Sequence, residues 1–115
     1  MKDCIFCKIS GGKVPTEKIY ENKKFFSIFD IDPIVEGHAL VISKEHYDTL
    51  FNLPENTGEE LIDCLKKTTS KIMKRENCDG FNIVNNGFEA GGQIVGHIHF
   101  HIIPRKKDDG LKIFN

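Results

Sequence analysis

Three histidines alternate with apolar residues in segment 96–104, whose sequence is Gly-His-Ile-His-Phe-His-Ile-Ile-Pro. Successive side chains of an extended chain point to opposite faces. His97, His99 and His101 would therefore share one face of a strand, and the apolar residues between them would share the other. Side chains on the same face lie roughly 6.5 Å apart along a strand. The pattern predicts a strand that packs one face on the core and presents three imidazoles to one site.

Three aligned imidazoles favour a functional role over a structural one. A neutral imidazole costs free energy when it is buried without a hydrogen-bond partner, so a row of three implies partners that use them. Imidazole also titrates near neutral pH. One histidine can therefore act as a nucleophile toward phosphorus or carbon while a neighbour donates a hydrogen bond.

The composition bounds the class of protein. With 115 residues the chain has the size of one domain, which we expect to span 1–115. Its net charge of -1, with acidic and basic residues mixed along the chain, provides no electrostatic footprint for nucleic acid or a membrane surface. No stretch approaches the roughly 20 apolar residues that cross a bilayer. We expect a cytoplasmic protein that binds neither nucleic acid nor membrane.

Hydrophobic patterns predict strands in the first half of the chain. Segments 18–21 and 25–29 are rich in aromatic and branched residues and are separated by Asn22-Lys23, which favours a hairpin. Segment 39–42 is a continuous apolar run typical of a central strand.

One long helix is predicted between Leu53 and Glu76, because apolar residues recur there at helical spacing. Pro54 suits a first turn, whereas segment 57–60 resembles a capping box, so two starting points stay open. Asp79-Gly80 is expected to end the helix. Segment 81–86 then forms a hairpin with the histidine strand across a wide loop. Strands with a single inserted helix indicate an α+β fold with a mainly antiparallel sheet.

The loop before the histidines, segment 86–93, is rich in glycine. Gly91 and Gly92 permit a positive φ and can turn backbone N–H groups toward an anion. A hairpin loop uses glycine in any case, so this signal is weak alone. Beside the histidines it predicts a phosphate cradle.

Cys4 and Cys7 form a Cys-x-x-Cys motif, which is found both in redox sites and in zinc sites. A zinc site needs two more ligands, and the five histidines of the chain could supply them. His46 follows an apolar strand in a loop from which a ligand could project. The other two cysteines, Cys64 and Cys78, are expected to be structural.

The segment from Asn86 to Arg105 resembles the histidine triad (HIT) nucleotide-binding family, whose signature is His-φ-His-φ-His-φ-φ with φ apolar. The likeness extends over nearly the whole chain, through segments 4–9, 29–33, 37–42, 44–46 and 79–82. The resemblance implies a HIT-like α+β fold: a five-stranded, mainly antiparallel sheet, one long helix and a shorter N-terminal helix. It also implies a two-fold homodimer in which the long helices and a strand of each subunit meet.

The same resemblance implies catalytic roles. His99 would attack the α-phosphorus and carry a transient nucleotidyl group, for which its distal nitrogen needs a lone pair. His101 would donate to a phosphate oxygen, and His38 would orient the triad. Charge that develops in the transition state would be held by N–H groups near Gly92, Gln93, Ile94 and His99.

Nucleoside recognition is implied in the same way. Asp30 would accept hydrogen bonds from both ribose hydroxyls, and Asn86 would bind the phosphate. The base would lie in an apolar slot formed by Ile5, Phe6, Ile9, Ile28, Phe29 and Ile31. Such a slot reads shape and stacking, so the expected ligand is a purine nucleoside monophosphate or its phosphoramidate or acyl derivative.

Zinc is implied by family members with two N-terminal cysteines, and here the ligands would be Cys4, Cys7, His46 and His97. Four protein ligands close a tetrahedral site, so the metal would be structural. The chain departs from many members at Ile94, where they carry Ser or Thr just after Gly-Gly-Gln.

Three functions therefore stand. The leading one is a nucleotidyl hydrolase of the adenosine 5′-monophosphoramidase type that acts through a covalent intermediate on His99. The first rival is a mononuclear zinc hydrolase whose water-activating metal is held by His97, His99 and a third residue. The second rival is a non-catalytic nucleotide-binding or interaction module.

Overall fold

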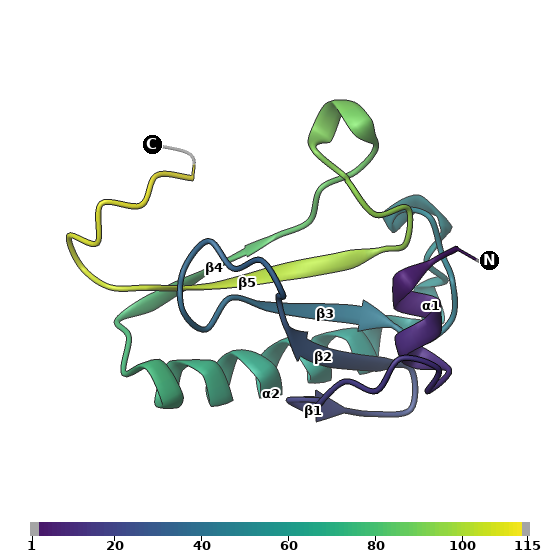
Figure 1. Ribbon diagram of the computed structural model, residues 1–115, viewed down its shortest axis with the longest axis horizontal. Coiled ribbons are helices and arrows are strands. Elements are labelled where there is room, and N and C mark those ends of the chain that lie inside the picture. Colours follow the sequence, from purple (N-terminus) through teal and green to yellow (C-terminus); the bar gives the residue numbers. More distant parts are fainter. Residues whose placement is uncertain (1–2, 114–115) are drawn as a thin grey trace.

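The computed structural model describes residues 3–113, which form one five-stranded antiparallel sheet with a helix on each side (Figure 1). The spatial order of the strands is β1-β2-β3-β5-β4. The elements are α1 (Ile5–Ser10), β1 (Tyr20–Glu21), β2 (Phe25–Phe29), β3 (Ala39–Ser43), α2 (Gly58–Glu76), β4 (Gly80–Val84) and β5 (His99–Arg105). The α+β class, the antiparallel sheet and both helices are confirmed. The single domain over 1–115 includes two residues at each end outside the described range, and it stays a prediction.

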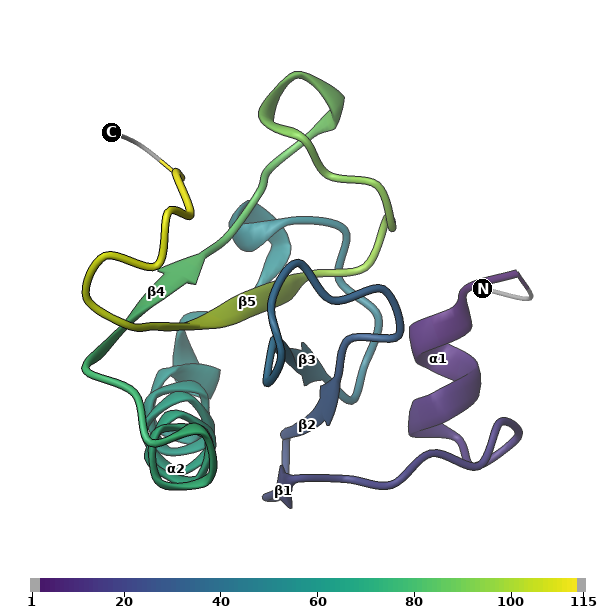
Figure 2. The ribbon, with the colours of Figure 1, turned by 60° about the vertical axis from the view of Figure 1, so that its left-hand side comes forward.

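The sheet separates two hydrophobic clusters, because residues of alternating parity face opposite sides. On one side Val41, Phe100 and Ile102 pack with α2 residues. On the other side Leu40 and Ile42 pack with residues of α1, whose buried members are Phe6 and Ile9. Figure 2 shows the two helices on opposite sides of the strands. In the register of β3 with β5, Leu40 is paired with His101 and Ile42 with His99, so these two histidines lie on the α1 side.

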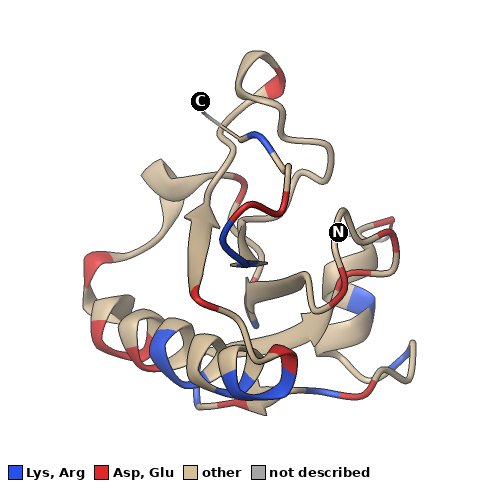
Figure 3. Ribbon diagram, turned by 90° about the vertical axis from the view of Figure 1, so that its left-hand side faces the viewer, with Lys and Arg blue, Asp and Glu red and all other residues tan. Residues whose placement is uncertain are grey.

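Helix α2 packs on the sheet through Cys64, Thr68 and Ile72, which are spaced by one turn and fully buried. Its first turn carries acidic residues and its last turn basic ones, an arrangement that complements the helix dipole (Figure 3). None of the helices in the described part of the chain has the length and apolar character that crossing a bilayer requires.

Helix α2 begins at Gly58 and ends at Glu76, the predicted last residue, but neither end is capped as expected. A 3-10 turn, Glu55–Thr57, precedes the helix, and the Thr57 hydroxyl donates to the Pro54 carbonyl at 2.6 Å. The predicted capping box therefore does not form. At the other end, Asn77 adopts a left-handed conformation with φ 50° and its N–H donates to the Met73 carbonyl. Asparagine tolerates this conformation, so the helix ends before Gly80, which instead begins β4.

The predicted hairpins form, but several strands are shorter than the sequence predicted. Strand β1 has only two residues, and β4 ends at Val84. Strand β5 begins at His99, so the prediction that His97 is part of the same strand is wrong. The physical reason is that the N–H of Ile98 donates to the Tyr47 carbonyl in a loop, at 2.7 Å, which takes this segment out of the ladder.

Candidate functional site

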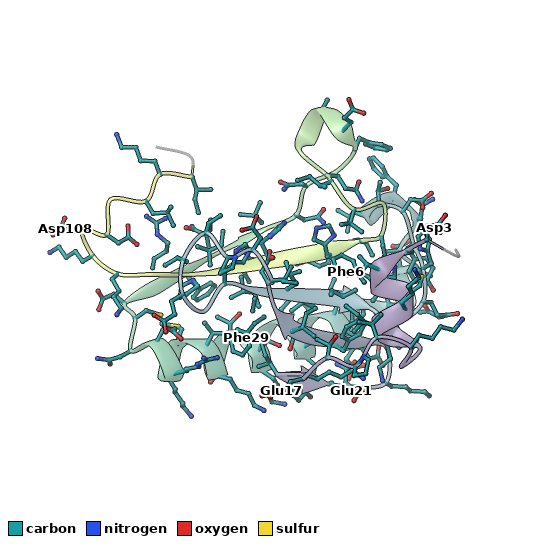
Figure 4. All side chains as sticks on the ribbon, in the orientation of Figure 1. Asp3, Phe6, Glu17, Glu21, Phe29 and Asp108 are labelled. Carbon is teal, nitrogen blue, oxygen red and sulfur yellow. The ribbon has the colours of Figure 1, made fainter. Side chains whose placement is uncertain are left out.

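A pocket of about 530 Å³ opens on the α1 side of the sheet. It lies between α1, the ends of β2 and β3, strand β5 and the glycine-rich loop. Phe6, 6% exposed, points from α1 into this region and makes edge contacts with the rings of His97 and His99 (Figure 4). The pocket is lined by most of the residues that the sequence predicted for the nucleotide: Ile5, Phe6, Ile9, Ile28, Phe29, Asp30, Ile31, His38, Asn86, Gly92, Ile94, His99 and His101.

Some lining residues were not anticipated from the sequence. Leu40 and Val95 line the pocket, together with Val14, Thr16, Asp32 and Ile34. Leu40 could not be singled out because segment 39–42 is apolar on both faces, and only the register with His101 shows which face it occupies.

The nitrogen of His99 that could act as a nucleophile is fixed by a backbone contact. His99 Nδ1 lies 2.7 Å from the carbonyl oxygen of His97. A carbonyl only accepts, so Nδ1 carries the proton and donates it. The lone pair of the neutral ring is therefore on Nε2. His99 lies at the floor of the pocket, 7% exposed.

The tautomers of His38 and His101 follow by the same reasoning. The backbone N–H of Ile34 donates to His38 Nδ1 at 3.2 Å, so the proton of His38 is on Nε2. That Nε2–H donates to His101 Nδ1 at 2.9 Å. His101 therefore carries its own proton on Nε2, where it can donate to a ligand. Gly37, with φ +91°, makes the turn that brings His38 to this position, and a Cβ there would lie 2.6 Å from the Glu76 side chain.

Asp30 completes this chain of polar groups. Its Oδ2 lies 3.4 Å from His38 Nε2, and its Oδ1 accepts the N–H of Asp32 at 2.9 Å. Asp30, His38 and His101 bring potential ligand atoms within 4.8 Å of one another. These three residues do not fit a metal. The Ile34 N–H donates to His38 Nδ1, so the ring proton is on Nε2, and a cation bound at Nε2 would have to displace it. The group is a hydrogen-bonded chain that ends at His101.

Burial, together with the neighbouring His99 and His38, lowers the pKa of His101 to about 4. In the unfolded chain the pKa is about 6.5, so the unfolded state takes up this proton first as the pH falls. Stability from His101 is complete above pH 6.5 and is lost between there and pH 4. We expect the free energy of unfolding to fall by about 1 kcal/mol more in the wild type than in His101→Asn between pH 7 and pH 5, allowing for partial solvent screening.

Urea unfolding at the two pH values, in zinc-containing buffer, measures this difference. Both proteins keep the same cysteine and histidine cluster, so its own pH dependence cancels. An equal loss of stability in the two proteins would contradict the prediction.

The glycine-rich loop is held by its own hydrogen bonds. The N–H groups of Gly92 and Gln93 donate to the carbonyls of Glu89 and Phe88. The Gln93 side chain accepts the Phe88 N–H and donates to the carbonyls of Asp48 and Val95, so it fixes the loop and is not among the pocket-lining residues. The N–H of Ile94 donates to no described residue. Of the predicted loop donors, Ile94 is the one left available to a ligand.

A second cluster lies next to His99 and consists of Cys4, Cys7, His46 and His97, whose ligand atoms all lie within 4.8 Å of one another. Cys4 Sγ lies 3.2 Å from His97 Nδ1. Cys7 Sγ lies 3.3 Å from His46 Nδ1 and 3.5 Å from His97 Nδ1. Tetrahedral zinc, with bonds of about 2.3 Å to sulfur and 2.0 Å to nitrogen, would place these atoms about 3.5 Å apart.

The histidine tautomers also fit a metal at this cluster. His97 Nε2–H donates to the Ser43 carbonyl at 2.8 Å, and His46 Nε2–H donates to Asp48 at 2.9 Å. Both Nδ1 atoms therefore direct lone pairs toward the thiols. Outer partners of this kind orient metal-binding histidines in proteins. The group could hold a metal.

The thiols give a second indication of fit. Burial raises the pKa of Cys7, and Cys4 raises it further through a hydrogen bond to the thiol and through repulsion between two thiolates. A divalent cation would remove this repulsion. The rival arrangement, a metal shared by His97 and His99, does not match the ligand set, since the His97 lone pair faces the cysteines and His99 is outside the cluster.

Comparisons with known proteins agree with this geometry. Residues 11–108 match the HIT domain family. An uncharacterized HIT-like protein of Methanocaldococcus jannaschii is 43% identical over 107 residues, which cover 93% of this chain and 82% of that protein. A protein of Candida albicans named adenosine 5′-monophosphoramidase is 38% identical over 109 residues, covering 91% of this chain and 72% of that protein.

A solved structure from Mycobacterium smegmatis is described as a Zn-bound histidine triad family protein. It superposes with a TM-score of 0.86 at 35% identity, and the match covers 97% of this chain and 81% of that chain. Together with the match over residues 11–108, these likenesses establish that the chain belongs to the HIT family of histidine triad proteins.

Proposed function

We propose that the protein hydrolyses purine nucleoside phosphoramidates or acyl nucleotides through a covalent nucleotidyl intermediate on His99. The observation that carries this proposal is the 2.7 Å hydrogen bond from His99 Nδ1 to the His97 carbonyl. It leaves the Nε2 lone pair available to attack phosphorus at the floor of the pocket. The name of the Candida albicans relative, an adenosine 5′-monophosphoramidase, supports the same reaction.

In the first step, His99 Nε2 forms a bond to the α-phosphorus, and the bond between phosphorus and the leaving group breaks. The leaving group takes the electron pair, and an amine also takes a proton from solvent. In the second step, water attacks the phosphorus, Nε2 recovers its lone pair, and the water proton passes to solvent. The product is the nucleoside monophosphate.

The proton of His101 Nε2 and the N–H of Ile94 would stabilise the charge that develops on the phosphate oxygens. His38 is a positioning residue in this scheme, because its Nε2–H donates to His101 Nδ1 and fixes the His101 tautomer. Asp30 would accept the ribose hydroxyls, and Asn86 would donate to the phosphate. The apolar slot on the α1 side would hold the base.

Adenosine 5′-phosphoramidate is the direct test substrate. We expect the purified protein to release AMP from it with multiple turnovers. Absence of turnover, with AMP still bound at the pocket, would favour the second candidate, a non-catalytic nucleotide-binding module. The presence of Ile94 supports the non-catalytic module, because an isoleucine side chain cannot donate a hydrogen bond to a leaving group.

Zinc held by Cys4, Cys7, His46 and His97 would act structurally. It would fix the N-terminal segment that carries Ile5 and Phe6 against the site, and four protein ligands leave no open position for water. We place the protein in the cytoplasm, a reducing compartment in which the thiols stay available to the metal.

We also propose a two-fold homodimer through β4 and α2. Strand β4 is an edge of the sheet, and its Phe81 and Ile83 are 46% and 41% exposed. Ile83 is paired with Ile102, which packs toward α2, so both side chains lie on the α2 side. Ile62 of α2 is also exposed, at 55%. An unpaired edge beside exposed apolar side chains favours association.

Replacing Ile83 by lysine is expected to convert the dimer to a monomer, because a charge at the interface would be desolvated. Sedimentation velocity measures the change. Phe51→Lys is the matched control, since Phe51 is 87% exposed and lies outside β4 and α2. A monomeric wild type, or a dimeric Ile83→Lys, would contradict the proposed interface.

A further inference from the structure

Isoleucines stand at the mouth of the pocket with almost no cover. Ile94 is 94% exposed, Ile31 is 99% exposed and Ile34 is 55% exposed, and all three line the pocket. A single exposed apolar residue on a protein surface is ordinary. Several at the rim of one pocket indicate a ligand with an apolar part that reaches the rim.

The position of His99 determines which part of a nucleotide reaches the rim. His99 is 7% exposed and lies at the pocket floor. In phosphoryl transfer the attacking and leaving groups lie roughly in line across the phosphorus. A leaving group displaced by His99 must therefore point away from the floor, toward the mouth.

Ile94 is the rim residue beside the phosphate. It lies two residues after Gly92, where an added Cβ would lie 3.7 Å from the Asn86 amide, and no described group accepts its own N–H, which can bind a phosphate oxygen. Ile31, in contrast, follows Asp30, on the side of the pocket proposed for the ribose. An N–H that binds the phosphate holds the Ile94 side chain next to the leaving group.

The described residues that line the pocket place no hydroxyl beside Ile94, and this bears on the chemistry of the leaving group. The only hydroxyl among the described lining residues belongs to Thr16, which lies between α1 and β1. An amine leaving group needs a proton, whereas a carboxylate does not, because carboxylic acids have a pKa near 4. A site without a hydroxyl donor at Ile94 suits the carboxylate.

We infer that the substrate is an acyl nucleotide with an apolar acyl group, and that Ile94 is the specificity-determining residue that contacts this group. The inference rests on the proposed function and deepens it. In the reaction, the bond from His99 Nε2 to phosphorus forms and the bond from phosphorus to the acyl oxygen breaks. The carboxylate leaves with the electron pair and without a proton. Water then cleaves the bond between nitrogen and phosphorus and releases its proton to solvent.

Three substrates with one nucleoside test the inference. They are hexanoyl-adenylate, an acyl-adenylate of equal chain length that bears two hydroxyls, and the hexylamine phosphoramidate of AMP. We expect kcat/KM for the hexanoyl compound to exceed that for the hydroxylated one by about tenfold, because Ile94 would cover one side of the apolar acyl chain and remove it from water. We expect it to exceed that for the phosphoramidate as well.

Two variants separate apolar contact from proton donation. Ile94→Ala should lower kcat/KM for the hexanoyl substrate about tenfold more than it lowers kcat/KM for the hydroxylated one. Ile94→Ser should do the same and should also raise turnover of the phosphoramidate, because it adds a hydroxyl. Leu50→Ser, at an exposed apolar residue outside the pocket, is the matched control and should change none of the three values. Because the Ile94 side chain is exposed, we expect its variants to fold normally, and thermal unfolding checks this.

The failure of the inference is distinguishable from that of the proposed function. Equal kcat/KM values for the two acyl substrates in the wild type, or values unchanged in Ile94→Ala, would overturn the role of Ile94 while hydrolysis stands. A wild-type preference for the phosphoramidate would overturn the acyl class. No turnover of any of the three substrates would overturn both the inference and the proposed hydrolase.

Discussion

Replacing His99 by alanine is expected to lower kcat/KM for adenosine 5′-phosphoramidate by at least about 10⁴-fold. The variant removes the Nε2 atom proposed to form the covalent bond to phosphorus, and no other described side chain can take that position without breaking a hydrogen bond. His101 uses its Nδ1 to accept from His38, and His97 directs its lone pair toward Cys4. Continuous assay of AMP release measures the loss.

His101→Asn is the comparison variant, because it removes the proposed donor to the phosphate and keeps the proposed nucleophile. We expect it to lose about 10²- to 10³-fold, the usual effect of deleting one such donor. The intermediate can be detected directly by quenching the wild type in alkali, where a nucleotidyl histidine survives, and measuring its mass. A His99→Ala protein that turns over within tenfold of the wild type would rule out the proposed intermediate. Zinc content and far-UV circular dichroism show whether each variant is folded.

Removing zinc is expected to have the largest effect on stability. A metal bound at a thousand times its Kd stabilises the folded state by about 4 kcal/mol, which corresponds to roughly 15 °C in Tm for a chain of this size. We therefore expect chelation to lower Tm by at least this amount, and Cys7→Ser to have a similar effect. Thermal unfolding measures the shift, and elemental analysis is expected to give one zinc per chain.

Cys78→Ser is the matched control, since this thiol is partly buried and donates only to the Gly80 carbonyl. It should change neither zinc content nor Tm appreciably. Below the lowered Tm, the chelated protein should keep its kcat and show a raised KM, because α1 carries Phe6 and Ile9 of the proposed base slot. Complete loss of kcat on chelation with the fold intact would point to a water-activating metal and contradict a structural role.

The sequence predicted most of the fold because its periodicities are strong. Segment 25–29 matches β2 at both ends, and the long helix was identified by apolar residues at helical spacing. Its ends were less predictable, because they depend on single hydrogen bonds. The Thr57 hydroxyl donates back to the Pro54 carbonyl and so forms no capping box. The helix ends at Glu76 as predicted, but Asn77 forms the cap that Asp79-Gly80 was expected to provide.

In the candidate site, too, local features could be predicted from the sequence and features set by distant contacts could not. The alternation in β5 placed His99 and His101 on one face, and this follows from local geometry alone. His97 does not share that strand, and its ring is buried against Phe6 and the cysteines by contacts from distant parts of the chain. Nor could the sequence show that the Gln93 side chain fixes the loop, leaving the Ile94 N–H as the available donor.

The sequence by itself thus determined which residues could take part: a row of imidazoles, a pair of thiols, a glycine-rich loop and the apolar segments that carry them. Only the tertiary structure decided their states. Each histidine tautomer is set by one hydrogen-bond partner. Four of these partners are Ile34, Ser43, Asp48 and the His97 carbonyl, and the fifth, which sets His101, is His38. The Ser43 contact joins segments 54 residues apart, and the Ile34 and Asp48 contacts form within loops whose course the fold sets. A local pattern can place an imidazole on a face, but which of its nitrogens holds a lone pair depends on what the folded chain brings to the other nitrogen.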